Sequence, residues 1–264
     1  MCALNQILPA TVEKLGKQGV EAVPVNMADV AALTEACAEV DCVVSSVAGL
    51  RDVIVEGQPV LLEAAVAAGV PRFIASDFSS DYTQQPTGEN RNFDLRKEFQ
   101  VRIEQAPLAA TSILNGGFGE LLTYGMPLLD FKQHQVGYWE DADWKIDFTT
   151  MDDTAAFTAA AALDETTPRW LHIASFQISP RELAAAAEVA GTGPFTLVRL
   201  GSRADLAARI AQTRAANPAG EQQLYANWQQ YMLSMFSVQN NPLDNARYPD
   251  VPWTSLQQVL RMRR

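Results

Sequence analysis

Three short turns of mostly small or polar residues are the parts of this sequence best suited to hold a ligand. They occupy residues 45–49, 76–78 and 115–118, and each follows a short apolar run. Small side chains let a ligand approach the backbone closely, and the adjacent Gly116 and Gly117 permit a positive φ angle. The predicted chemistry is therefore binding through backbone and small polar groups.

The elements around the first two turns predict two parallel strands. Residues 42–44 are an apolar run, residues 60–68 repeat apolar side chains at helical spacing, and residues 72–75 are a second apolar run. Gly69 and Pro71 end the helix between them. A strand–helix–strand unit makes both strands parallel with a right-handed crossover. Their polar ends then meet at the carboxyl edge of the sheet, where open α/β sheets bind ligands.

The remaining periodicity predicts further strands and helices. Strands are expected at 21–25, 111–114, 137–139, 144–148, 170–174 and 195–198, and helices at 11–17, 30–38, 93–105, 154–163, 181–190, 203–215 and 221–236. Asp29 is predicted to cap the second helix, and either Thr150 or Asp152 the helix from 154. Ser179 and Glu182 have the spacing of a capping box.

Composition narrows the class of protein. The 264 residues are 48% hydrophobic, which is enough for a substantial core, and the formal net charge of −11 disfavours a nucleic-acid partner. Cys37 and Cys42 lie in apolar patterns and are predicted to be buried thiols in a reducing compartment. The sequence contains no apolar run of about 18 residues, so no membrane span is predicted, and no signal peptide is evident. Cytoplasmic localisation is the resulting expectation.

The residue types and their spacing disfavour a metal site, a serine hydrolase and a Tyr-x-x-x-Lys catalytic pair. His134 and His172 are the only histidines, and neither has a cysteine or carboxylate at metal-ligand spacing, so no metal is expected. His172 lies in an apolar run and is interpreted as a core or sheet histidine. No G-x-S-x-G elbow occurs, and none of the six tyrosines is followed by lysine four residues later.

Four segments carry a resemblance to a known family. They read DCVVSSVAG, AAGVPRFIASDFS, TSILNGGFGELL and DFTTMDDTAAFTAAAAL, and their order and spacing are specific. The chain resembles the NmrA-like branch of the atypical short-chain dehydrogenase/reductases, which are related to isoflavone reductases. The resemblance extends from about residue 1 to the C-terminal YPDVPWTSLQQVL. It implies an α/β fold with a Rossmann-like doubly wound parallel sheet and a smaller α+β C-terminal region on the substrate side.

The resemblance also implies a division of the chain and a cofactor site. It implies an NAD(P)-binding domain at residues 1–135 and a substrate-side region at 136–264, with 149–175 packing back on the Rossmann sheet. NADP is the expected cofactor, with NAD as a possibility. The cofactor-binding residues that it implies are Asn26, Met27, Ser46, Val47, Ala48, Ser76, Asp77, Phe78, Asn115, Gly116, Gly117 and Phe118. For Ser76, a cap of the following turn is an equally good interpretation.

Two departures from the family pattern bear on function. In the family, the helix that corresponds to residues 93–105 carries a lysine. Arg96 occupies that position in this chain, and Lys97 follows one residue later, about 100° around the helix. Arginine is a poor general base because it stays protonated. The glycine-rich phosphate-binding loop is also absent from these residues. Either about 30 residues are missing, the size of one βαβ unit, or the chain is a natural variant.

The prediction is an NAD(P)H-dependent oxidoreductase that acts on a small organic substrate, with Arg96 and Lys97 as the candidate catalytic residues. The alternatives are a non-catalytic dinucleotide-sensing regulator and a shortened form with impaired cofactor binding. A small molecule is the expected partner, without nucleic acid or membrane, and the chain is expected to be a monomer or homodimer.

Overall fold

The computed structural model describes residues 2–4, 9–123, 128–224 and 241–262. The chain divides into two compact units. Unit 1 comprises residues 1–76, 95–111 and 165–169, and unit 2 comprises 77–94, 112–164 and 170–264.

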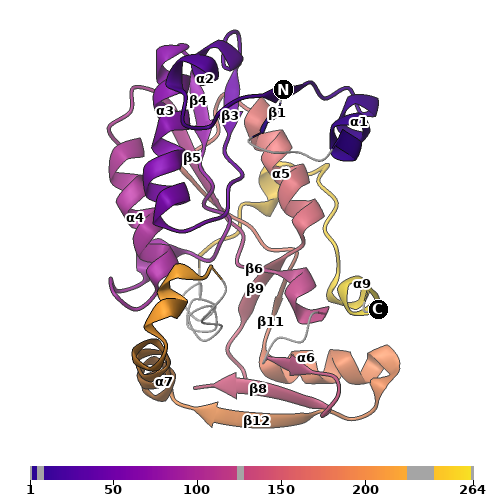
Figure 1. Cartoon of the computed structure of the whole chain (residues 1–264). Coiled ribbons are helices and arrows are strands. Elements are labelled where there is room, and N and C mark those ends of the chain that lie inside the picture. The colour runs from indigo at the N-terminus through magenta and orange to yellow at the C-terminus, as the bar shows by residue number, and fades with distance from the viewer. Residues whose placement is uncertain (1, 5–8, 124–127, 225–240, 263–264) are drawn as a thin grey trace. The chain divides into compact units, whose positions relative to one another are not determined.

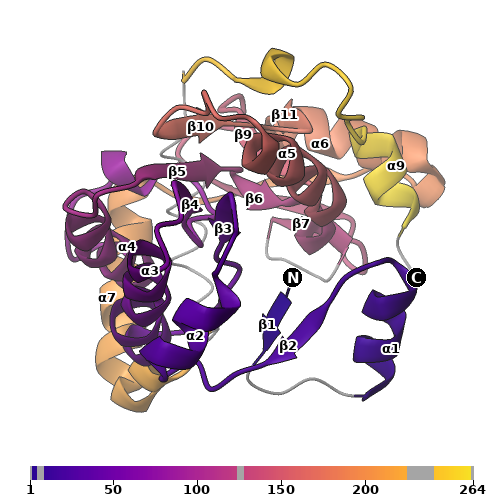
Figure 2. The same cartoon turned by 90° about the horizontal axis from the view of Figure 1, so that it is seen from above.

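Unit 1 is built from parallel strands and the helices that join them. Its elements are β1 (Cys2–Leu4), α1 (Pro9–Lys17), β2 (Ala22–Pro24), α2 (Val30–Ala36), β3 (Cys42–Val44), α3 (Gln58–Ala67), β4 (Arg72–Ile74), most of α4 (Arg91–Ile103) and the first half of β5 (Ala109–Leu114). β4 pairs in parallel with β3 and with β5, while β1 and β2 form a separate two-stranded parallel sheet. Figure 2 shows α2 and α3 on one face of β3, β4 and β5.

The central strand–helix–strand unit forms as the sequence predicts. α3 follows a π-helical turn, Asp52–Gly57, and ends before Gly69, whose φ of 73° is the left-handed conformation that glycine adopts readily. Leu33, Leu61, Phe73 and Phe99 belong to one buried cluster, which joins α2, α3, β4 and α4. Cys37 is buried as predicted, whereas Cys42 is only half-buried.

Unit 2 contains the second half of β5, which pairs with β10, and two three-stranded sheets. Its elements are β6 (Gly117–Phe118), β7 (Leu129–Asp130), β8 (Gln135–Trp139), β9 (Ile146–Thr149), α5 (Met151–Leu163), β10 (Trp170–His172), β11 (Phe176–Ile178), α6 (Pro180–Ala187), β12 (Thr196–Gly201), α7 (Arg203–Ala216) and α9 (Leu256–Arg261). β10 pairs in parallel with β5, β9 pairs with β11 and β6, and β8 pairs with β12 and β7. α6 lies along β8 and β12 (Figure 1).

Local capping signals in unit 2 behave as predicted. Thr150 caps α5 by accepting the backbone N–H of Asp153, and Ser179 with Glu182 forms the complete capping box of α6. The neighbouring strands β8 and β9 belong to different sheets and do not pair with each other. Most of the helix predicted at 221–236 lies outside the described residues. In the part of the chain that is described, no helix is long and apolar enough to span a membrane.

Candidate functional site

In unit 1, one serine joins the turns that follow two neighbouring strands. The Ser76 hydroxyl donates to the carbonyl oxygen of Val47 at 2.6 Å and accepts the Val47 backbone N–H at 3.0 Å. The Ser45 N–H donates to the Ile74 carbonyl at 2.8 Å, which extends the pairing of β3 with β4. The predicted binding residues Ser46 and Ala48 remain exposed on this turn. The carboxyl ends of β3 and β4 therefore meet, as the sequence predicts.

Gln58, which the sequence patterns do not single out, also belongs to this region. Its side chain is 2% exposed, and its Oε1 accepts the backbone N–H of Ser76 at 2.9 Å. Burial costs a polar side chain free energy unless it finds a partner, and the free Ser76 N–H at the strand end supplies one. Gln58 thus stabilises the same turn. The sequence signal for its burial was its place at the start of the mostly apolar helix α3.

The first predicted contact region follows β2. Asn26 is exposed, and its Oδ1 accepts the Ala28 N–H at 3.0 Å, while Met27 packs against the unit 1 core. Asp29 caps α2 as predicted by accepting the N–H of Ala32. The Asn26 amide nitrogen is therefore the group of this segment that can still bind a ligand.

The candidate catalytic residues Arg96 and Lys97 lie on α4, in its unit 1 part. Both are half-buried, while Leu95 and Phe99 on the same helix enter the core. Consecutive helical residues point about 100° apart, so the two cations leave the helix in different directions. Their role as catalysts stays a prediction.

In unit 2, Asp77 of the second turn has a buried carboxyl group. One oxygen, Oδ2, accepts both the Tyr82 hydroxyl at 3.0 Å and the Ser112 hydroxyl at 2.5 Å. A parallel bridge between Ser79 and Leu114 continues the same alignment. Phe78 is half-buried beside it. The turn after β4 is thereby held along the carboxyl half of β5.

The third turn has the tight backbone that its two glycines predict. Gly116 has a φ of 66°, and a Cβ atom there would overlap the carbonyl group of Asp147. Asn115 is fully buried, its carbonyl accepts the Thr149 hydroxyl at 2.7 Å, and Gly117 opens β6. Phe118 is half-buried. The turn is thus pressed against β9 through Gly116.

Two titratable groups near this turn were not singled out from the sequence. Asp147, on β9, is 4% exposed, and burial raises the pKa of its carboxyl group. A hydrogen bond from Gln177 and the charge of His172 offset part of that rise. Asp81 is 2% exposed and lies 3.3 Å from His172 Nε2. Burial of Asp81 opposes its ionisation, but hydrogen bonds from His172 and Thr83 outweigh it and lower the pKa.

Among the residues that the structure describes, no group of three or more histidine, cysteine, aspartate or glutamate side chains is arranged to hold a metal ion.

Comparison with known proteins gives a family and a fold. A model of the NmrA-like family matches residues 8–193. A bifunctional pinoresinol-lariciresinol reductase of Linum album is 27% identical over 259 residues, which cover 92% of this chain and 78% of the relative.

Two solved structures show the same fold at low sequence identity. The complex of Vitis vinifera leucoanthocyanidin reductase with NADPH superposes with a TM-score of 0.78 at 21% identity, over 99% of this chain and 89% of that one. A structure described as AtPrR2 with NADP⁺ and (+)-pinoresinol gives a TM-score of 0.76 at 21% identity, over 96% and 85%. The Rossmann-like α/β fold expected from the sequence is confirmed.

Proposed function

Because the chain belongs to the NmrA-like family, we propose that it is an NADP(H)-dependent oxidoreductase that reduces a small organic substrate. Relatives and structural neighbours support this proposal: they include a pinoresinol-lariciresinol reductase and reductase structures that contain NADPH or NADP⁺. A phenolic molecule of the pinoresinol kind is accordingly the first substrate to test. NAD is the alternative cofactor.

One observation carries the proposal. In unit 1 the carboxyl ends of the parallel strands β3 and β4 meet, and the Ser76 hydroxyl locks the two turns together through both backbone groups of Val47. Such an edge is the ligand-binding edge of open α/β sheets. Its exposed residues, Ser46 and Ala48, are small enough for a sugar or phosphate to approach the backbone.

Each unit, taken by itself, contains residues that we propose to contact the cofactor. In unit 1, Asn26 and Met27 would hold the adenine, and Ser46, Val47, Ala48 and Ser76 the adjoining ribose and phosphate groups. In unit 2, Asp77, Phe78 and the turn 115–118 would border the nicotinamide. The left-handed Gly116 supports this assignment, because it keeps the turn free of a side chain. When bound, the nicotinamide supplies the hydride, and the protein supplies orientation.

The alternative is a regulator that senses the dinucleotide without turnover. Arg96 favours it, because an arginine at the position of the family's lysine cannot act as a general base at neutral pH. A form with impaired cofactor binding is the third possibility.

Two measurements separate these functions. Isothermal titration with NADPH, NADP⁺ and NADH tests binding, and NADPH oxidation at 340 nm with pinoresinol, quinones and aldehydes tests turnover. Tight NADPH binding with substrate-dependent oxidation is expected. Binding without oxidation by any substrate would favour the regulator, and absence of binding would exclude both dinucleotide functions.

We also propose a division of the chain into two parts. Residues 1–135 would form the dinucleotide domain and residues 136–264 the substrate-side region, in which 149–175 packs back on the sheet. The free thiols of Cys37 and Cys42 support a cytoplasmic location. Either a monomer or a homodimer is compatible with it.

A further inference from the structure

His172 and Asp81 form a side-chain pair within unit 2 that the proposed site residues do not include. The His172 Nε2 lies 3.3 Å from Asp81 Oδ2, and the Asp81 side chain is only 3% exposed. Asn241 Nδ2 donates to the same oxygen at 2.9 Å. The other oxygen, Oδ1, accepts the backbone N–H and the hydroxyl of Thr83 at 3.0 and 2.5 Å. Both oxygens of the carboxylate are thereby occupied and its position is set.

The imidazole ring keeps one nitrogen available. Nε2 faces Asp81, and within the described part of the chain nothing forms a hydrogen bond with Nδ1. The side chain is 17% exposed, so the ring is reachable although its partner is buried. A carboxylate that orients one ring nitrogen while the other faces a reactant is the arrangement used for general acid–base catalysis.

The pair lies beside the turn proposed to border the nicotinamide. His172 ends β10 and is aligned with Leu114, the residue before Asn115. The Thr149 hydroxyl joins the two strand ends, because it donates to the carbonyl groups of both Asn115 and Ile173. This is the carboxyl edge of two parallel strands, where α/β sheets bind ligands.

Three carboxyl groups from three elements lie near His172. Asp81 comes from the loop after β4, and Asp147 from β9 is close enough for the charge of His172 to lower its pKa. Asp244, from the C-terminal segment, accepts the His172 backbone N–H at 2.8 Å. Acidic side chains of three different elements thus lie near His172.

We propose that His172, oriented by Asp81, is the proton donor in the reduction, an assignment that rests on the proposed function. When bound, NADPH would supply a hydride to the carbonyl carbon of an aldehyde or ketone substrate. The π electron pair of the C=O bond would move to the oxygen, which would take the proton from Nδ1 of His172. NADP⁺, the alcohol and a neutral imidazole would remain, and a proton from solvent would return to Nδ1.

The test compares variants in the NADPH oxidation assay with the substrates named above. H172Q keeps an amide that can reach Asp81 but cannot deliver a proton, so kcat should fall about 100-fold. The KM for NADPH and the thermal midpoint should change little. The pH dependence of kcat should differ between the wild type and H172Q, because glutamine does not titrate.

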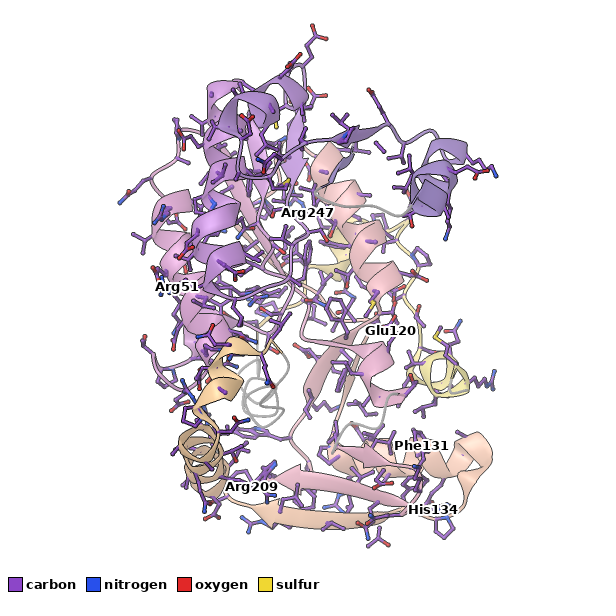
Figure 3. All side chains as sticks on the ribbon, viewed as in Figure 1. Arg51, Glu120, Phe131, His134, Arg209 and Arg247 are labelled. Atoms are coloured by element: carbon purple, nitrogen blue, oxygen red, sulfur yellow. The ribbon has the colours of Figure 1, made fainter. Side chains whose placement is uncertain are left out.

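A rescue experiment separates chemistry from structure. H172A should be inactive and should regain activity when free imidazole is added, which a purely structural histidine would not permit. The matched control is H134N. His134 stacks on Phe195 and adopts a positive φ of 52°, which asparagine tolerates. Figure 3 shows His134 at the turn before β8. This variant should keep the wild-type rate.

The outcomes distinguish this assignment from the proposed function. If the wild type oxidises NADPH and H172Q retains at least about a third of kcat, or if imidazole restores nothing to a folded H172A, the assignment is overturned and the proposed function stands. If the wild type oxidises NADPH with none of the substrates, both are overturned.

Discussion

Ser76 and Val47 are joined by two hydrogen bonds through a single hydroxyl group, although 29 residues separate them in the chain. The hydroxyl donates to the Val47 carbonyl and accepts its N–H, so it occupies both backbone groups of one residue. Without Ser76, the Val47 N–H and carbonyl groups would need water or a ligand as hydrogen-bond partners. The serine therefore holds the turn in one conformation before a ligand binds.

Replacing Ser76 by alanine should loosen this turn. Two backbone groups of a half-buried residue lose their partner, which should lower the free energy of unfolding by about 1–3 kcal/mol. The affinity for NADPH should fall about tenfold, because the turn is no longer preorganised. Denaturant unfolding and isothermal titration measure the two effects.

The control for this variant is Ser46→Ala, on the same turn but exposed. Its stability should stay within about 0.5 kcal/mol of the wild type. If S76A and S46A lost the same amount of unfolding free energy, the Ser76 hydrogen bonds would not be what organises the turn.

Replacing Gly116 by alanine tests how closely the third turn approaches β9. Gly116 has a φ of 66°, and an added Cβ would overlap the Asp147 backbone. Gly69 has a similar φ of 73°, but an added Cβ meets nothing within 4 Å. G69A should therefore cost only the left-handed strain of about 1–2 kcal/mol. G116A should cost distinctly more, about 3 kcal/mol or above. Similar unfolding free energies for the two variants would contradict the close approach.

Asp147 should make the protein less stable as the pH rises. Burial raises its pKa in the folded state above the unfolded value of about 3.9, so the folded state binds its proton more tightly. The stability associated with this group is then full below about pH 4 and is lost as the pH rises through the folded-state pKa. D147N cannot ionise and should be more stable than the wild type at pH 8, with a smaller difference at pH 4. Urea unfolding at both pH values measures this.

Asp81 provides the comparison of opposite sign. Its pKa is lowered, because hydrogen bonds from His172 and Thr83 outweigh burial. Its contribution is therefore present above about pH 4 and is lost as the pH falls through the folded-state pKa. D81N should be less stable than the wild type at pH 8 and should approach it in acid. If both variants shift stability in the same direction at pH 8, the assignment of at least one of the two environments is wrong.

Local signals were sufficient for much of the fold. The β3–α3–β4 unit, the stop at Gly69, the cap at Asp29 and the capping box at Ser179 all depend on residues within a few positions of each other. Hydrophobic spacing, a side-chain oxygen before a helix and a glycine after it act through local geometry. A single sequence contains all of that information.

The sequence by itself thus determined the strands, the helices between them and the three turns at their ends. Only the tertiary structure decided that Gln58 turns inward to Ser76, that β8 and β9 join different sheets, and that Asp81 meets His172 across 91 residues of chain. The reason is that a polar side chain forms a long-range pair only where packing removes its water and another element offers a partner. No periodicity in the sequence records which distant partner that is.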